Sequence, residues 1–367
     1  GVNSGVYFTF DTTTSSDVNY RIAISYVSIE NAKENLENEK INEDFKTYKQ
    51  TTEAAWDLNL SKIIVESANK DRKTQFYTNL YHALIHPNIV SDVNGEYMGA
   101  DFKVHKTNLE AQYSSFSVWD TYRTQAQLLA ILFPKQSSDM MQSLVDFADQ
   151  SGGFGRWILA NIETGIMQGD PTPILISNSY VFGATNFDFK KAYYHMKNGA
   201  NIPLLYSQDK EIRPYLTEYL RDGHTFASMM LEYTSSDFAI GQFALLALNL
   251  EEDALYFKER AQNWKNIYNP NNKWLNSKYP NNKWKDIDQD WREATYKNYF
   301  WMVPYNLETL INTIGGSDVA ENRLDSFFKR LDASYDDDWF AAGNEPNFQA
   351  PWIYNWTDAA YKTTEVV

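Results

Sequence analysis

The sequence predicts a mainly α protein, and two observations support this fold class. Apolar residues recur at helical spacing through most of the chain after residue 28. About ten such stretches are joined by loops, with no strand-like alternation between them. A long series of helices without intervening strands favours helical hairpins arranged as an α/α barrel or toroid.

Composition limits the classes of function. The chain has 367 residues, 43% hydrophobic and 22% charged, which is enough to bury a sizeable core. No apolar run approaches the ~20 residues that cross a bilayer, so no membrane partner is expected. The net charge of -15 argues against nucleic-acid binding, because phosphate backbones require basic surfaces. Cysteine is absent, which rules out disulfides and thiolate chemistry. Aromatic residues, at 16%, favour neutral ligands such as sugars, which bind against aromatic faces.

Residues 1–30 form the part of the chain predicted to be β. Apolar and polar residues alternate in Val6–Phe10 and again in Tyr20–Val27, with a turn-rich segment between them, and this pattern predicts a β-hairpin. Two strands alone are marginal in water, so this hairpin would have to pair with further strands. The first residues show neither the basic nor the apolar region of a signal peptide.

Helical spacing begins at Ile29 and continues to residue 68, which predicts linking helices over 31–70. The next helix, 71–86, should end near His86, because a residue before proline avoids the helical region. Further helices are predicted over 128–133, 139–150, 173–182, 188–199, 226–249, 251–268, 303–314 and 317–331. Residues 269–287, rich in Asn, Lys and Trp, are expected to be irregular.

The stretch 157–170 continues this helical series but is unusually polar. It places Glu163 and Asp170 among apolar residues and glycines, which destabilises a fold unless both carboxylates are hydrogen-bonded. A loop that lines a ligand is the simplest explanation. Asp120 and Arg123 lie near another predicted helix start, where both could face a pocket.

Glu293 is the candidate catalytic residue. It precedes a helical pattern and has Tyr299 and Trp301 nearby in sequence, and large rings beside a carboxyl raise its pKa, as a general acid requires. The alternative is that Glu293 only complements a helix dipole. A second polar segment, 343–356, combines amides, carboxylate and aromatics that could bind a hard cation or sugar hydroxyls, although an ordinary Asn/Pro loop would read the same way. Zinc, nucleophile-elbow, phosphate-loop and EF-hand motifs are absent.

Seven sequence motifs together resemble one family, glycoside hydrolase family 92. In chain order they are Ile24–Leu36, Phe76–His82, Trp119–Arg123, Glu163–Met167, Leu231–Tyr233, Glu293–Asn306 and Gly343–Pro346. The resemblance implies the last strands of a β-sandwich domain over 1–30, linking helices over 31–70 and an (α/α)6 barrel over 71–367. It also implies inverting, calcium-dependent removal of terminal α-linked mannose from mannose-containing glycans, in an extracytoplasmic location.

The resemblance also implies roles for individual residues. Glu293 matches the general acid of the family. The residues implied to bind the sugar are Trp119, Asp120, Arg123, Glu163 and Asn344, and those implied near the Ca²⁺ ion are Asn344 and Glu345. The acid motif differs from the usual Glu-Gly-Asn/Thr-x-Trp-Gln-Tyr, because Lys297 replaces Trp and Asn298 replaces Gln. Tyr305-Asn306 likewise stands where His-Asp is usual.

The catalytic-base segment of the family is expected beyond Val367. The remaining N- and C-terminal parts of the same protein are therefore the expected partners, and residues 1–367 alone should not hydrolyse mannosides. Two other functions are also compatible with the sequence. One is a non-catalytic module that captures glycans, and the other is a purely structural toroid, in which Asp120 and Glu163 would be fully exposed.

Overall fold

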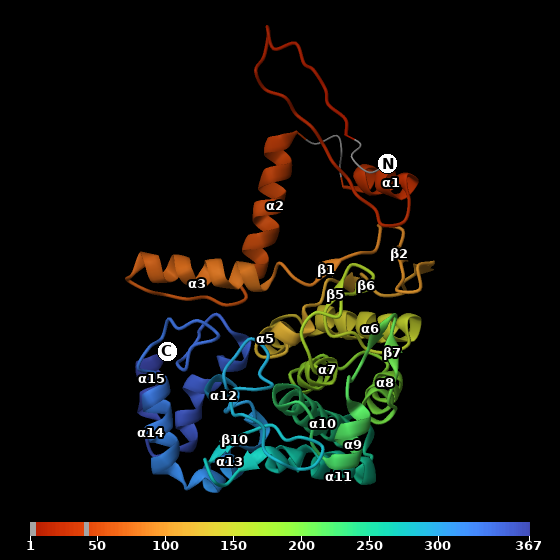
Figure 1. Ribbon diagram of the computed structural model, residues 1–367. Helices are drawn as coiled ribbons and strands as arrows, with labels where there is room; N and C mark the ends of the chain where they lie inside the picture. The colour runs from red at the N-terminus through yellow and green to blue at the C-terminus, as the bar shows by residue number, and fades with distance from the viewer. Residues whose placement is uncertain (1–4, 40–43) are drawn as a thin grey trace.

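The computed structural model describes residues 5–39 and 44–367. Residues 1–4 and 40–43, which belong to the predicted β-segment and linking helices, lie outside the described residues. The chain forms a compact body of helices, from which the N-terminal part projects (Figure 1). Within the described residues, no helix is both long enough and apolar enough to cross a membrane.

No strand forms in the segment for which an N-terminal hairpin was predicted. Residues 5–28 run out and back as an irregular chain with no strand. Their apolar side chains are exposed, with Val6 at 82% and Tyr7 at 88%. Without a third strand or a packed face, two short strands gain too little to hold a ladder, which explains the difference.

Three helices connect this segment to the body, namely α1 (Ile29–Asn38), α2 (Phe45–Leu60) and α3 (Lys70–Ala83). Each begins where a side-chain oxygen caps the first turn, supplied by Ser28, Asp44 and Asn69 respectively. No residue of α2 is buried and α3 buries only Leu80, so both lie outside the body, and α2 points away from it (Figure 1). α1 and most of α2 fall where helices were predicted over 31–70, and α3 matches the helix predicted over 71–86.

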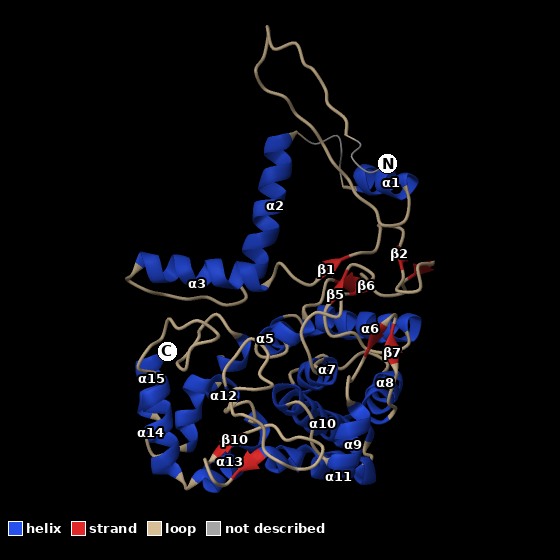
Figure 2. Ribbon diagram, viewed as in Figure 1, coloured by secondary structure: helices blue, strands red, loops and turns tan. Residues whose placement is uncertain are grey.

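The strands are short, antiparallel and paired two by two (Figure 2). The pairs are β1 (Asn88–Ile89) with β4 (Tyr113–Ser114), β2 (Glu96–Met98) with β3 (Val104–Lys106), β5 (Ile158–Leu159) with β6 (Ile162–Glu163), β7 (Tyr206–Ser207) with β8 (Lys210–Glu211), and β9 (Tyr268–Asn269) with β10 (Trp274–Leu275). They shape the loops between helices and form no larger sheet in the described part of the chain.

The body itself is helical. Its elements are α4 (Val118–Thr121), α5 (Gln125–Leu132), α6 (Pro134–Ser151), α7 (Thr172–Val181), α8 (Phe189–Asn201), α9 (Leu216–Asp222), α10 (Ala227–Leu248), α11 (Glu251–Arg260), η1 (Ala261–Ile267), α12 (Tyr296–Tyr299), η2 (Pro304–Asn306), α13 (Leu307–Ile314), α14 (Ser317–Phe327), η3 (Glu345–Asn347), η4 (Ala350–Trp356) and α15 (Tyr361–Val366). Most of the predicted helices are confirmed. The structure adds α9 and α15, which are too short to show a clear period.

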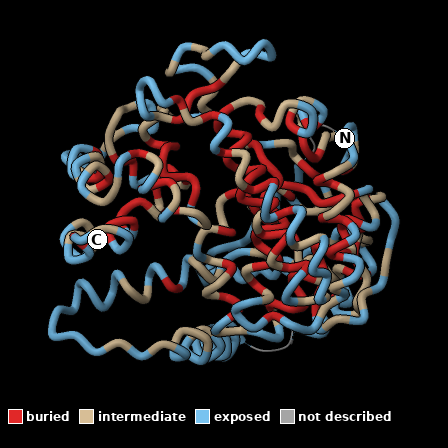
Figure 3. The backbone as a smooth tube through the Cα atoms, turned by 90° about the horizontal axis from the view of Figure 1, so that it is seen from below, coloured by how far each residue is buried: buried red, intermediate tan, exposed pale blue. Residues whose placement is uncertain are grey.

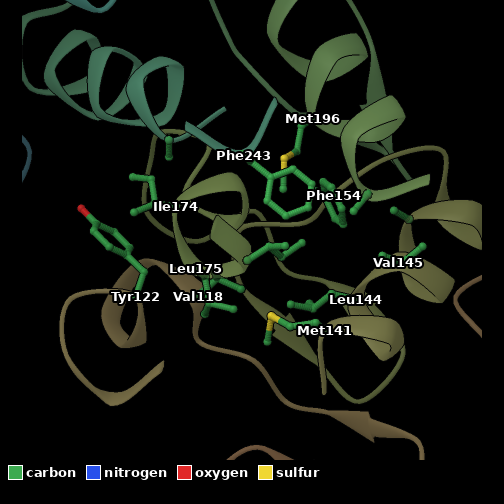
Figure 4. Close-up of a cluster of buried hydrophobic side chains, with 14 of the residues drawn as sticks. Val118, Tyr122, Met141, Leu144, Val145, Phe154, Ile174, Leu175, Met196 and Phe243 are labelled. Carbon is green, nitrogen blue, oxygen red and sulfur yellow. The ribbon is translucent and has the colours of Figure 1, made fainter. Parts of the chain in front are cut away.

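Helix α10 is the central element, because two hydrophobic cores meet along it. Its first turns, from Ala227 to Tyr233, pack with α9, α13 and α14. Its later turns, from Ala239 to Ala244, pack with α6, α7 and α8 (Figure 4). Buried segments concentrate in this body (Figure 3). Between the two cores α10 carries a layer of buried polar residues, which includes Glu232 and Asp237.

The stretch 157–170 is not a helix. It forms the β5–β6 hairpin followed by a loop. A loop was expected from the sequence here, whereas the hairpin was not. Backbone N–H groups in this loop bond to Glu163 instead of to helical carbonyl groups, which stabilises the loop over the helix.

Candidate active site

Asp120 lies on α4, where the neighbouring loop holds it in place. The indole Nε1 of Trp157 donates to Asp120 Oδ2 at 3.0 Å. Asp120 is half-buried, and this burial raises the pKa of its carboxyl, although the Trp157 bond and the Arg123 charge oppose the shift. The structure therefore places a partly desolvated carboxyl at a position predicted to bind sugar, and the full exposure expected of a purely structural toroid is not seen.

Glu163 holds the loop that carries Trp157. Its carboxylate accepts backbone N–H bonds from Arg156 at 2.9 Å, Trp157 at 3.2 Å and Gly165 at 2.9 Å. The side chain is buried, and a Cβ at Gly155 would collide with it, which explains the glycine there. Glu163 was predicted to bind sugar, but its bonds go to its own loop, so it acts on Asp120 through Trp157.

Arg123 is almost enclosed, with its side chain 3% exposed. The guanidinium lies over the rings of Trp119 and Tyr122, with its carbon 4.6 and 4.5 Å from the ring centroids. Nη2 donates to Glu232 Oε1 at 3.2 Å and Nη1 contacts Met302 Sδ at 3.3 Å. Trp119, also predicted to bind sugar, is buried with its indole N–H directed to Glu232, so it supports the site from behind.

Glu293 differs from its prediction in environment. Its side chain is exposed and does not lie among rings, because the chain turns at Glu293 with φ of +48° and α12 begins only at Tyr296. The backbone on either side is fixed. Arg292 N donates to Ser228 Oγ on α10 at 3.1 Å, and Asn344 Nδ2 donates to the Glu293 carbonyl at 2.8 Å. A carboxyl on a fixed backbone at an open position can reach a ligand from solvent.

Glu345 connects these groups electrostatically. Burial raises the pKa of its half-buried carboxyl, and the negative charges of Asp120 and Glu293 raise it further, whereas Arg123 lowers it. Glu345 therefore lies within electrostatic reach of both carboxyls. The bond from Asn344 Nδ2 to the Glu293 carbonyl joins the segment that carries Glu345 to the segment that carries Glu293.

The segment 344–347 supplies oxygen donors of more than one kind. Asn344 uses Nδ2 for the Glu293 carbonyl, which leaves its Oδ1 as an acceptor, and Glu345 follows it in the chain. Asn347, on the next turn, is wholly buried and neither of its side-chain polar atoms has a partner. In the described part of the chain, no three acidic or histidine side chains cluster closely enough to hold a metal alone. A cation here would take amide, backbone and carboxylate oxygens, as Ca²⁺ does.

The sequence predicts no role for Glu232, although this residue lies in the Leu231–Tyr233 motif. It is fully buried on α10 and accepts bonds from Trp119 Nε1 at 3.1 Å, Tyr122 Oη at 3.0 Å, Arg123 Nη2 at 3.2 Å and Tyr299 Oη at 3.3 Å. The signal was present in the sequence, because a carboxylate inside an apolar helix must have partners.

The glycosyl hydrolase family 92 catalytic domain matches residues 31–367, and the chain therefore belongs to this family. The family 92 α-mannosidase of Bacteroides thetaiotaomicron is 27% identical with a TM-score of 0.83, over 93% of this chain and 46% of that one. The structure of that enzyme in complex with mannoimidazole is 26% identical with a TM-score of 0.82, over 93% of this chain and 48% of that one.

A family 92 inverting mannosidase of Bacteroides thetaiotaomicron VPI-5482 shares the fold at 23% identity, with a TM-score of 0.82 over 90% of this chain and 49% of that one. An uncharacterized secreted glycosidase of Arthroderma benhamiae is 23% identical over 97% of this chain and 47% of its own length. The chain spans about half the length of these relatives. With the helical architecture, the matches confirm the predicted fold class, mainly α and of the (α/α)6-barrel type.

Proposed function

We propose that the protein to which this chain belongs is an exo-acting α-mannosidase that removes terminal α-linked mannose from glycans with inversion. The observation that carries the proposal is the match of residues 31–367 to this family, supported by the half-buried carboxyls of Asp120 and Glu345 and by the bond that joins Asn344 to the Glu293 carbonyl. The mannosidase names of the structural relatives support the sugar. The name of the secreted relative supports an extracytoplasmic location.

In this mechanism Glu293 protonates the leaving glycosidic oxygen. Its exposed carboxyl lies on a backbone fixed at both ends, so it can approach that oxygen without rearrangement of the fold. Asp120 and Arg123 bind sugar hydroxyls, and the negative charges around the site stabilise the positive charge that develops on the ring. By family resemblance, the base that activates water belongs to the segment expected after Val367.

Calcium is part of the proposal. Asn344 and Glu345 would hold the ion, which would supply positive charge to bind and orient mannose hydroxyls. The oxygen-rich donors there suit a hard cation.

The test is Glu293→Gln, assayed on mannosides with good and poor leaving groups. Glutamine cannot donate a proton, so turnover should fall about 10²–10⁴-fold where the leaving oxygen is basic, and much less with an activated aryl mannoside. The measurement is kcat for both substrates in the full protein.

Glu308→Gln is the matched control, because Glu308 is exposed on α13 and plays no role in the site. It should leave both rates unchanged. Equal losses on the two substrates for Glu293→Gln would reject the acid role. Sugar binding without any turnover by the full wild-type protein would favour the alternative of a non-catalytic module.

A further inference from the structure

Glu232 is a buried carboxylate on α10 that accepts hydrogen bonds from four side chains, all of them outside its own helix. It has no exposed surface, and both of its oxygens accept hydrogen bonds. Burying an ion pair is weak evidence for stability, because desolvation offsets the attraction, and well-packed apolar residues often serve as well. A charge kept at such a position calls for another explanation.

The donors to Glu232 come from two segments of the candidate site, one around α4 and one around α12. Trp119 and Arg123 flank Asp120 on the α4 side. Tyr299 lies on α12, in the segment that begins with Glu293, and is fixed in turn by Gln168 Nε2 at 2.9 Å. One carboxylate therefore links the segment that carries Asp120 to the segment that carries Glu293.

The same carboxylate is the counter-ion of Arg123. Two nitrogens of that guanidinium lack an oxygen acceptor, because Nε is buried without a partner and Nη1 contacts the sulfur of Met302. Its positive charge lowers the pKa of the Asp120 carboxyl and of the Glu345 carboxyl, against the effect of their burial. Without a buried anion behind it, Arg123 would pair with these two carboxyls and occupy the groups that should meet the ligand.

We propose that Glu232 is the positioning residue of the sugar site, because it holds Arg123, Trp119 and Tyr299 in place and withholds Arg123 from Asp120 and Glu345. Glu232 itself does not touch the ligand. This inference rests on the proposed function, since it assumes that the site binds a mannose-like ring.

Asp237 offers a matched control on the same helix. It is equally buried and pairs with Arg213 at 2.8 Å and with Arg260 at 2.6 Å. Tyr219 also donates to it, at 2.8 Å, and none of these partners contacts the candidate site residues. Replacing either carboxylate by its amide removes one buried charge from α10, but only Glu232→Gln changes the surroundings of Arg123.

The experiment compares Glu232→Gln with Asp237→Asn by calorimetric titration of mannoimidazole and by thermal unfolding of the full chain. Glutamine keeps an oxygen for three donors and Tyr122 can turn to accept from its amide, so mainly the charge is lost. We expect Kd to rise at least about tenfold for Glu232→Gln and to stay within about twofold for Asp237→Asn, although both lower Tm.

A third comparison covers the case in which Glu232→Gln does not fold. The double variant Arg123→Gln/Glu232→Gln restores neutrality, and its Kd should equal that of Arg123→Gln alone, because the two residues act as one unit. Unchanged binding by Glu232→Gln, equal weakening by Asp237→Asn, or additive losses in the double variant would overturn the inference. No binding by wild type would instead overturn the proposed function.

Discussion

Two carboxylates of the site, Glu163 and Glu345, show how partners decide the role of a residue. Glu163 accepts three backbone N–H bonds and is committed to its loop. Glu345 is half-buried beside two other acids, so its neighbours repel its charge. The Glu345 carboxyl is therefore better suited to bind a cationic ligand than to stabilise the fold, because a bound positive charge would relieve the repulsion.

Calcium should therefore stabilise the protein through Glu345. We expect millimolar Ca²⁺, added after chelator treatment, to raise the Tm of wild type by a few degrees, because an ion that binds only the folded state stabilises it. Glu345→Gln should remove most of this increase. Differential scanning calorimetry with and without calcium measures the effect.

Glu308→Gln serves again as the control and should respond to calcium as wild type does. Mg²⁺ should stabilise wild type less than Ca²⁺, because it keeps its waters and demands stricter geometry. A calcium response that survives in Glu345→Gln would place the ion elsewhere.

The candidate site was predictable at the level of residue type and less so in detail. Asp120, Arg123, Glu293 and Glu345 could be proposed from motifs. The structure shows the bond from Trp157 to Asp120 and the bond from Asn344 to the Glu293 carbonyl, which join parts of these segments. The surroundings of Glu293 could not, because sequence neighbours such as Tyr299 point into the core while the chain turns at Glu293. The role of Glu232 depends on contacts more than a hundred residues apart, which no local pattern records.

At the scale of elements, α1 is attached to the body by a polar contact group centred on Asp92. Asp92, 7% exposed, accepts bonds from Ser25 Oγ at 2.7 Å, Asn31 Nδ2 at 2.8 Å and Asn35 Nδ2 at 2.7 Å. Asn31 also donates to Glu96 Oε2 at 2.9 Å, and Asn35 Oδ1 accepts from Val93 N at 3.0 Å. Few apolar side chains assist, since Asn31 is the only residue that α1 buries in the described structure. The position of α1 therefore depends on this polar group, in which the Asp92 carboxylate accepts the most bonds.

Asp92→Ala should loosen residues 24–38 without unfolding the body. Buried donors left without a partner cost ~1–3 kcal/mol, so exchange of these amides should be about tenfold to a hundredfold faster. Hydrogen–deuterium exchange with peptide resolution checks this, with the α10 peptides as internal reference.

Asp44→Ala makes the same chemical change at the N-cap of α2. It should speed exchange in the first turn of α2 and leave residues 24–38 as they are. If Asp92→Ala left residues 24–38 protected, apolar packing and not this contact group would hold α1.

The helices and strands differ in how accurately they could be predicted from the sequence. A helix with an apolar face, such as α8, follows its predicted bounds closely because burial of one face sets its period. The 5–28 segment has strand-like alternation but no surface to pair with. The β5–β6 hairpin is set by side-chain to backbone bonds from Glu163, which hydrophobic periodicity does not detect.

On the scale of the whole molecule, buried tyrosines link stability to alkaline pH. Burial raises the pKa of Tyr97 and of Tyr113 to about 12, from an ordinary value of 10.0. An acid whose folded pKa is raised contributes stability that is complete below the unfolded pKa and is lost as pH rises through the folded one. The loss should therefore fall between about pH 10 and 12.

Tyr113→Phe tests this sign, because phenylalanine cannot ionise. Relative to wild type, the free energy of unfolding of Tyr113→Phe should increase between pH 9 and about pH 11.5, as the unfolded wild-type chain gains from ionisation. Urea denaturation at both pH values measures the change. A constant difference across this range would mean that Tyr113 titrates normally in the folded protein.

Helix α10 serves two hydrophobic cores and also carries Glu232, the carboxylate bonded to Trp119, Arg123 and Tyr299. Substitution along it is constrained from every side, whereas the loop segments 159–162, 291–297 and 342–343 are partly or fully exposed and have fewer packing constraints. Evolutionary divergence in sugar linkage should therefore accumulate in those loops while α10 drifts slowly. A lineage can acquire a new glycan by changing loop length and loop side chains, and can leave its central helix unaltered.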